Sequence, residues 1–310
     1  MTTVTAGATD REEAGGVDLP RVQGGAQPQH LLTTLLGDYW GTNREHLPSA
    51  ALVRLLAEFG VTSTGARAAL SRLSRRGLLE SSKVGRRTYY GLTSRAAEVL
   101  AEGTRRILSF GRSNRPWGGR WTVVAFSLPE EQRDLRHTLR TRLRWLGFAP
   151  LYDGMWVSPR EDDDEVVLVL AELGVGTATV MSAVVTSGSP VVGNPGSAWD
   201  LKGLRRTYAG FIAGYTPLRD RVRSGVVGAS EALVARTEVM DSWRNFPNLD
   251  PELPDTLLPP HWPRLAAREI FVEVYDGLAP LAEARFRQVL AAQAPGLAHL
   301  AHSHTSRLLG

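Results

Sequence analysis

Residues 61 to 90 read VTSTGARAALSRLSRRGLLESSKVGRRTYY, and this stretch predicts a short helix followed by a hairpin. Thr62 or Ser63 can accept hydrogen bonds from the free amides of a first helical turn. Gly77 suits the left-handed residue that ends many helices. Between these positions, apolar side chains recur every three or four residues and form a stripe that we expect to be buried: Ala66, Ala69, Leu70 and Leu73.

The opposite face of this predicted helix is small, hydroxylic and cationic. It carries Thr64, Arg67, Ala68, Ser71 and Arg75, with Arg72 at its edge. Beyond the helix, two β-prone runs at 78–82 and 88–92 flank the basic segment 83–87, so we interpret the stretch as a recognition helix followed by a wing. Upstream, residues 30–36 and 49–59 predict two further short helices, which would complete a helix-turn-helix.

The charge balance of this module favours a polyanionic partner. Glu80 is the only acidic residue between positions 61 and 95. A solvated helix face is the simpler explanation of a charged run, but such a face normally mixes both signs. We therefore predict that the module binds double-stranded DNA through these residues: Thr64, Arg67, Ser71, Arg72, Arg75, Lys83, Arg86 and Arg87.

The length and composition exclude several classes of protein. The chain has 310 residues with a formal net charge of +4 and 43% hydrophobic residues, enough for two or three globular domains. It has no cysteine, which rules out disulfides, thiolate zinc sites and cysteine nucleophiles. No apolar run has the length of a membrane helix, so we expect a cytoplasmic protein. We expect residues 1–27 to be a disordered leader and not a signal peptide.

The middle of the chain predicts a compact mixed domain. Strands and helices are expected in the order β-α-β-β-α-β, at 120–127, 129–145, 148–152, 155–158, 162–173 and 177–186. Asp153-Gly154 is a typical hairpin turn between the second and third strands. This order over roughly 65 residues is the ferredoxin-like arrangement.

The whole chain is therefore predicted to be an α+β multidomain protein. After a Gly/Ser/Pro-rich linker, the remaining sequence is mostly helical with a proline-dense insertion at 247–263. The predicted parts are the leader 1–27, a winged helix 28–111, a ferredoxin-like domain 119–187, a helical C-terminal domain 197–298 and a polar tail 299–310.

With these parts in this order, the chain resembles the PaaX family of bacterial transcriptional repressors, which control phenylacetate catabolism. The resemblance is carried by ARAALSRLSRRGLL and RRTYYGLT in the first module, and by WTVVAFSLPEEQRDLRHTLRTRLRWLGF and LYDGMWVSPR in the second. FPNLDPELPDTLLPPHWP carries it in the third. The resemblance implies a central domain similar to the Cas2 nuclease fold. It also implies a homodimer on operator DNA that is released by an aryl-acetyl thioester of coenzyme A, such as phenylacetyl-CoA.

A metal-dependent nuclease of the Cas2 type is the main alternative to a DNA-binding repressor. That chemistry needs a carboxylate at the end of the first strand of the central domain, to hold a divalent cation. Here the strand ends in Ala125-Phe126-Ser127, and Glu130 and Glu131 suit the start of the following helix better. The acidic run 161–165 and the histidines of the tail do not define a metal site either. The sequence contains neither G-x-G-x-x-G nor a P-loop, so we predict no enzyme activity, no catalytic residue, no bound metal and no cofactor.

Aromatic and arginine residues are concentrated in the C-terminal part. Core packing is the simpler explanation of the aromatic residues. As a group they could also line a site for an aryl-acyl thioester, with guanidinium groups on its phosphates. On this basis we predict effector contacts by Trp199, Arg205, Arg206, Tyr208 and Arg219. A constitutive DNA-binding protein without effector control is the remaining alternative. The large C-terminal part argues against it, because a sensor or a dimer needs such a part and simple DNA binding does not.

Overall fold

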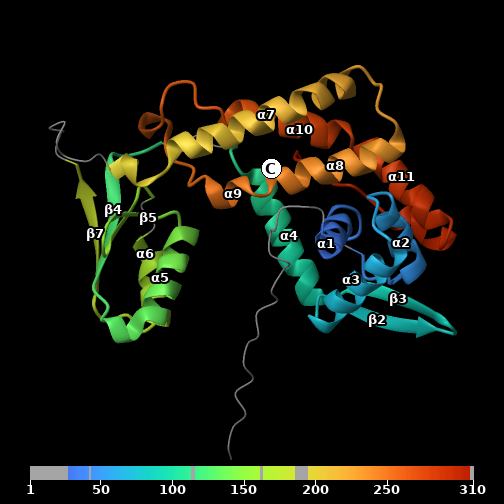
Figure 1. The fold of residues 1–310 in the computed structure, drawn as a ribbon, viewed down its shortest axis with the longest axis horizontal. Helices are drawn as coiled ribbons and strands as arrows, with labels where there is room; N and C mark the ends of the chain where they lie inside the picture. The colour runs from blue at the N-terminus through green and yellow to red at the C-terminus, as the bar shows by residue number, and fades with distance from the viewer. Residues whose placement is uncertain (1–26, 42, 113–115, 161–162, 186–194, 308–310) are drawn as a thin grey trace, which may run out of the picture. The chain divides into compact units, whose positions relative to one another are not determined.

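The computed structural model describes residues 27–41, 43–112, 116–160, 163–185 and 195–307 (Figure 1). Nearly all of the predicted leader lies outside these residues. The chain divides into two compact units, and helix α4 (Ser94–Ser109) contributes to both. One unit contains residues 1–104 and 283–303, and the other contains 105–282 and 304–310. The boundaries predicted from sequence for the individual domains remain a prediction. In the described residues, no helix combines the length and apolar character needed to cross a membrane.

The first unit is built on three short helices. They are α1 (Pro28–Tyr39), α2 (Ser49–Ala57) and α3 (Ser63–Arg75). Each turns an apolar face inward, because leucine and alanine recur at helical spacing. Side chains from all three helices are at most 1% exposed: Leu32, Leu35, Leu36, Leu52, Leu55, Leu56, Ala66, Ala69, Leu70 and Leu73. The first and second helices occupy the regions that the sequence predicted, and α1 is longer at both ends.

A three-stranded antiparallel sheet follows the third helix. Its strands are β1 (Leu47–Pro48), β2 (Leu79–Val84) and β3 (Arg87–Leu92), in the order β1-β3-β2. The hairpin is tighter than the sequence predicted, since only Gly85 and Arg86 lie between the paired ends Val84 and Arg87. Gly85 has φ of +60°, a conformation that a two-residue hairpin loop favours and that glycine adopts without strain. Lys83 and Arg87 are therefore strand residues and not loop residues.

The end of the chain packs against the first unit through its residues 283–303. Ala301 is fully buried, and the amide of His302 donates to the carbonyl oxygen of Tyr39 at 3.2 Å. The ring of Tyr39 also stacks on Phe286 of α11 (Ala279–Ala291), with ring centroids 4.8 Å apart. The sequence predicted a polar tail at residues 299–310, but Ala301 and Ser306 of its described part are buried, and Ser306 donates to the carboxylate of Asp276.

The second unit contains a four-stranded antiparallel sheet with the strand order β5-β6-β4-β7. The strands are β4 (Arg120–Phe126), β5 (Ala149–Tyr152), β6 (Met155–Ser158) and β7 (Ala178–Val184). Helices α5 (Arg133–Trp145) and α6 (Asp163–Glu172) cover one face. Leu139 and Leu143 of α5 are fully buried there, with Val124 and Trp156 from the sheet.

The turn between β5 and β6 depends on a glycine. Gly154 has φ of +75°, and its carbonyl oxygen accepts a hydrogen bond from the amide of Phe126 at 2.8 Å. A Cβ atom at position 154 would lie 2.6 Å from the carbonyl oxygen of Phe126. The predicted Asp153-Gly154 turn is thus fixed by the close approach of β4, a tertiary contact that the local sequence does not reveal.

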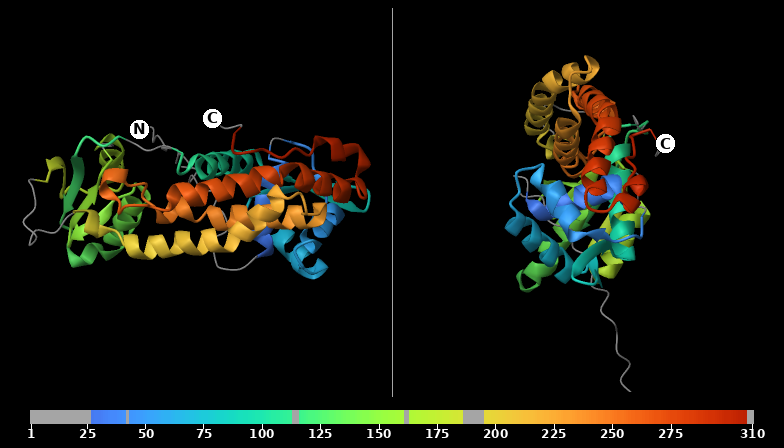
Figure 2. Two further views of the ribbon diagram at one scale, coloured as in Figure 1. Left: turned by 90° about the horizontal axis from the view of Figure 1, so that it is seen from above. Right: turned by 90° about the vertical axis from the view of Figure 1, so that its right-hand side faces the viewer.

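A layer of helices completes the second unit. Its long members are α7 (Leu201–Arg223), α8 (Ala229–Trp243) and α10 (Arg264–Gly277), which run alongside one another in Figure 2. The proline-dense segment forms the short helices α9 (Phe246–Leu249) and η3 (Asp255–Leu257). Aromatic rings fill the core between these helices. Trp243 stacks on Phe271 at 4.8 Å and Tyr208 stacks on Phe246 at 4.3 Å.

Candidate functional site

Helix α3 presents the predicted recognition face to solvent. Its first turn is capped by Thr62, whose Oγ1 accepts a hydrogen bond from the amide of Gly65 at 3.2 Å. The buried stripe holds the helix against α1 and α2, so the residues opposite it must point outward. Those residues are exposed, as are the basic residues of the hairpin: Thr64, Arg67, Ser71, Arg72, Arg75, Lys83, Arg86 and Arg87.

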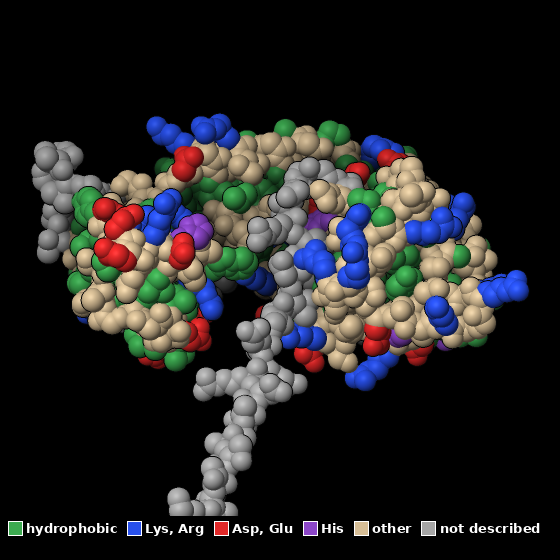
Figure 3. All heavy atoms as spheres, turned by 60° about the horizontal axis from the view of Figure 1, so that its bottom comes forward, with side chains coloured by type: hydrophobic (Ala, Val, Ile, Leu, Met, Phe, Trp, Pro, Cys, Tyr) green, Lys and Arg blue, Asp and Glu red, His purple; other side chains and the backbone are tan. Residues whose placement is uncertain are grey.

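The cations of this surface have no acidic partners among the residues that the structure describes. Within the described ranges, no carboxylate lies within 4.0 Å of the side-chain nitrogens of these six residues: Arg67, Arg72, Arg75, Lys83, Arg86 and Arg87. In Figure 3, Lys and Arg side chains project from the side of the molecule that contains α1–α3 and the hairpin. Unpaired guanidinium groups on a protruding helix and hairpin are a suitable surface for phosphates.

The one carboxylate of this region has its own partner. Glu80 of β2 lies 3.2 Å from Nε2 of His46, whose Nδ1 is 2.8 Å from the hydroxyl of Ser82. The ring of His46 occupies the space beside Gly91, where a Cβ atom would be 2.3 Å from the imidazole. Sequence reasoning missed His46, because its contact with the hairpin arises from the pairing of β1 with β3.

The predicted effector residues lie in different surroundings. Trp199 stacks near Trp121 on the sheet and, with Arg206, lines a cavity of about 480 Å³. Arg205 lies over the ring of Trp262, 5.6 Å from its centroid. Arg219 is paired with its neighbour Asp220 at 2.8 Å. Of the predicted set, therefore, only Trp199 and Arg206 line this cavity.

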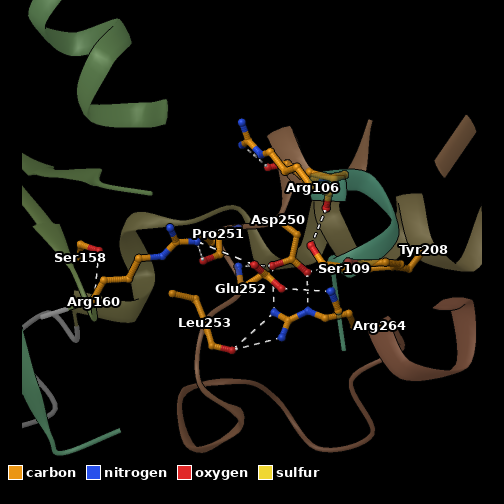
Figure 4. Close-up of polar contacts among 12 residues, drawn as sticks. Arg106, Ser109, Ser158, Arg160, Tyr208, Asp250, Pro251, Glu252, Leu253 and Arg264 are labelled. Atoms are coloured by element: carbon orange, nitrogen blue, oxygen red, sulfur yellow. Dashed lines mark hydrogen bonds and ion pairs between the residues drawn. The ribbon is translucent and has the colours of Figure 1, made fainter. Parts of the chain in front are cut away.

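Tyr208, the fifth predicted effector residue, belongs to a buried polar cluster (Figure 4). Its ring is fully buried and its hydroxyl donates to Oδ2 of Asp250 at 2.6 Å. Burial and the neighbouring carboxylate of Asp250 raise the pKa of Tyr208, so the phenol stays neutral. Arg264 completes the cluster with two further bonds to Asp250. Tyr208 has a structural role here and offers no surface to a ligand.

The polar residues Ser127 and Glu130, just after β4, have structural partners. Ser127 follows β4, and its amide donates to the carbonyl oxygen of Thr177. Glu130 lies at the start of η1 (Glu130–Gln132) and pairs with Arg136 at 3.0 Å. In the described residues, no group of three or more His, Asp or Glu side chains is arranged to hold a metal ion. Residues 161 and 162 of the acidic run lie outside the described residues.

A second basic surface was not anticipated from the sequence. Arg106 of α4, Arg144 of α5 and Arg160 line a cavity of about 250 Å³ together with residues 247–251. These arginines are far apart in the chain, and each belongs to a segment with many charged residues. Only the packing of the sheet domain against the proline-dense segment brings them to one place.

The exposed cationic helix and hairpin in the first unit, followed by a sheet domain and a helical layer, define a candidate nucleic-acid-binding protein with further domains. Comparison with known proteins then identifies the family to which the chain belongs. Three family models match in sequence order: PaaX-like protein at residues 27–96, the PaaX protein central Cas2-like domain at 114–191, and the PaaX-like protein C-terminal domain at 199–288. The chain belongs to the PaaX family.

Individual relatives agree with this assignment. The chain is 26% identical over 260 residues to the transcriptional repressor PaaX of Escherichia coli K12, an alignment that covers 81% of this chain and 80% of that protein. Among solved structures it is similar to an uncharacterized protein of Mycobacterium tuberculosis, Rv0674, with a TM-score of 0.55 and 22% identity. That match covers 83% of this chain and 97% of the other, and it shows a shared fold.

Proposed function

We propose that this protein is a DNA-binding transcriptional repressor that an acyl-CoA effector releases from its operator. The observation that carries the DNA-binding part is the exposed face of α3, with Arg67, Arg72 and Arg75 free of carboxylate partners within the described residues. The named E. coli relative, a transcriptional repressor, supports the regulatory role. A cytoplasmic location follows from this role.

The first module is proposed to act as a winged helix. A capped helix follows α2 through a short turn, and a two-residue hairpin follows the helix directly. In such modules the second helix enters the major groove and reads base edges, while a flanking hairpin meets the backbone. We assign base reading to Arg67, Ser71 and Arg75, which are exposed on α3. We assign phosphate contacts to Lys83, Arg86 and Arg87, which are exposed on the hairpin.

The central domain is proposed to be a ferredoxin-like scaffold without catalysis. Its strand order β5-β6-β4-β7, with every neighbouring pair antiparallel, supports the ferredoxin-like reading. At the end of β4 the chain offers the hydroxyl of Ser127 where metal chemistry would need a carboxylate. We therefore assign this domain to assembly and signal transmission.

A homodimer is proposed because a single winged helix buries too little DNA surface for tight operator binding. Two modules held by a dimer would read two half-sites in successive helical turns. An effector can then cause release only through a different affinity for the two states. A shift from 99% to 1% occupancy requires about 5.5 kcal/mol, which contacts with an acyl-CoA thioester can provide.

A mobility-shift titration tests this function. The probe is duplex DNA from the promoter region next to the gene, and random duplex of the same length is the control. We expect tight binding to the promoter that phenylacetyl-CoA reverses and that free phenylacetate leaves intact. If no coenzyme A ester releases the DNA, the effector assignment fails and a constitutive DNA-binding protein remains. If promoter and random DNA bind equally, the repressor assignment fails.

A further inference from the structure

A two-pronged ion pair joins the C-terminal helix α11 to α2 of the first unit (Figure 1). Nε of Arg285 lies 3.0 Å from Oε2 of Glu58, and Nη2 lies 2.8 Å from Oε1. The two residues are 227 positions apart in the chain. Nη1 of Arg285 donates to Oε1 of Gln288 at 2.7 Å. All three nitrogens of the guanidinium group are engaged, which fixes its plane and gives the pair one geometry.

Glu58 lies at the end of α2, just before the turn that leads into α3. Within this turn the amide of Gly60 donates to the carbonyl oxygen of Ala57 at 3.0 Å. Gly60 has φ of +73°, the left-handed conformation in which many helices end. Thr62, four residues after Glu58, caps α3. The position of the Glu58 carboxylate therefore bears directly on the segment that sets the angle between α2 and α3.

The helix α2 by itself gives no reason for a carboxylate at position 58. The carbonyl oxygens at the end of a helix carry partial negative charge, so an acidic residue there lowers helix stability. The side chain of Glu58 is also only 11% exposed, and removing a carboxylate from water is unfavourable unless it is paired. Arg285 offsets both effects, since it supplies the counter-charge. The pair therefore serves the contact between α2 and α11.

Helix α11 can hold Glu58 in place because α11 is itself fixed within the first unit. Phe286, the neighbour of Arg285, is fully buried and stacks on Tyr39 of α1. The side chain of Asn43 donates to the carbonyl oxygen of Leu300 at 2.9 Å, which ties the segment after α11 to the segment after α1. Packing thus fixes α11 to α1, and the ion pair fixes α11 to the turn between α2 and α3.

We propose that Arg285 is a positioning residue for operator recognition. Through Glu58 it holds the turn before α3, and hence the exposed face of α3, at the angle that base contacts require. This inference rests on the proposed DNA-binding function. Hydrogen bonds to base edges tolerate only small displacements, whereas attraction to phosphates tolerates larger ones. Loss of the pair should therefore lower affinity for the operator much more than affinity for random DNA.

Binding of the full-length protein to promoter and random duplex tests the proposal. Arg285→Gln and Glu58→Gln should each weaken promoter binding about 2- to 30-fold and leave binding to random duplex within about twofold. The first variant removes a positive charge and the second removes a negative one. An effect of overall charge on DNA binding would therefore have opposite signs in the two variants. The double variant should bind no more weakly than the weaker single variant, because the same pair is lost only once.

Arg223→Gln is the matched control. Arg223 of α7 forms a pair of the same kind with Glu273 of α10 in the second unit, at 2.7 and 2.8 Å. The control removes the same charge and a similar pair, and it should leave promoter affinity within about twofold. Hydrogen exchange gives a second measurement on the same proteins. In Arg285→Gln, peptides that contain Gly60 should exchange faster, whereas peptides from the buried part of α1 should exchange as in the wild type.

The other possible results each have a defined meaning. The proposal is wrong if either single variant binds the promoter like the wild type, or if promoter and random duplex lose affinity equally. It is also wrong if Arg223→Gln weakens promoter binding as much as Arg285→Gln does. If Arg285→Gln does not fold, Arg285→Lys, which keeps the charge without the two-pronged geometry, decides by the same comparison. If the wild type binds both duplexes equally, the repressor function fails, and hydrogen exchange still decides whether Arg285 holds the turn.

Discussion

Arg264 and Asp250 form a two-pronged ion pair in the interior of the second unit, with Nε–Oδ2 and Nη2–Oδ1 distances of 2.8 Å each. The Asp250 carboxylate also accepts from Tyr208 and from the amide of Glu252, which leaves it fully bonded. Glu252 has φ of +54°, and its own carboxylate accepts from the amide of Gly111. The pair thus fixes the proline-dense segment against the end of α4.

Asp250→Asn should lower the free energy of unfolding by about 3–5 kcal/mol, because it leaves the guanidinium of Arg264 buried without a counter-charge. Tyr208→Phe removes one hydrogen bond to the same carboxylate and should cost about 1.5–3 kcal/mol. Chemical denaturation of both variants measures the difference. Equal losses for the two would show that the ion pair contributes no more than the hydroxyl.

Arg67→Ala or Arg75→Ala should weaken operator binding by about 1–3 kcal/mol and relax sequence preference, if each arginine makes a paired contact with guanine. Binding to random duplex should change much less. Competition titrations with promoter and random DNA measure this. Arg133→Ala, an exposed arginine of the other unit, is the matched control. Equal losses on both kinds of DNA would contradict base reading by α3.

The double variant Arg86→Ala, Arg87→Ala should weaken binding to all duplexes alike, since hairpin cations are expected to meet phosphates. Two lost phosphate contacts should lower the slope of log K against log salt concentration by about 2. Binding measured at several salt concentrations tests this. An unchanged slope would mean that the hairpin does not approach the DNA backbone.

Glu283→Gln should reduce stability at neutral pH but have less effect in acid. Partial burial by itself raises the pKa of Glu283. The hydrogen bonds from the amide and hydroxyl of Ser303 and the charge of Arg287 outweigh this and lower the pKa below its ordinary 4.5. A carboxyl with a lowered folded-state pKa stabilises the protein above the unfolded pKa, and this stability is lost as pH falls through the folded value.

The measurement for Glu283 is the difference in unfolding free energy between wild type and Glu283→Gln, from pH 7 to pH 3.5. We expect the difference to shrink below about pH 4.5, where the carboxyl of the unfolded chain is protonated. Glu98→Gln, at an exposed position on α4, is the control and should show little change. A difference that grows in acid would contradict the lowered pKa of Glu283.

The central domain should leave nucleic acids intact. Purified protein with Mg²⁺ or Mn²⁺ should not cleave single- or double-stranded DNA or RNA, because the end of β4 lacks the carboxylate that would hold the cation. Gel analysis over a range of protein concentrations tests this. Cleavage that rises with protein and disappears in Glu130→Ala would overturn the assignment of this domain as non-catalytic.

The sequence alone determined the local elements of this protein and which residues of α3 face solvent. Apolar residues at helical spacing and a capping threonine specify α3 whatever surrounds it, and the cations on its other face then must point outward. The order of strands and helices in the central domain could also be predicted from the sequence, because the spacing of apolar residues differs between strands and helices. The family resemblance drawn from these stretches is confirmed by the three matching family models.

Tertiary structure alone decided which distant residues meet. Tyr208 and Arg264 each lie in an ordinary helical pattern, and nothing in their neighbourhoods predicts that both bind Asp250. Arg106, Arg144 and Arg160 likewise come together only because the sheet domain packs against residues 247–251. Local sequence specifies which face of an element is apolar, whereas packing between elements decides which polar groups share a cavity and which are buried with a partner.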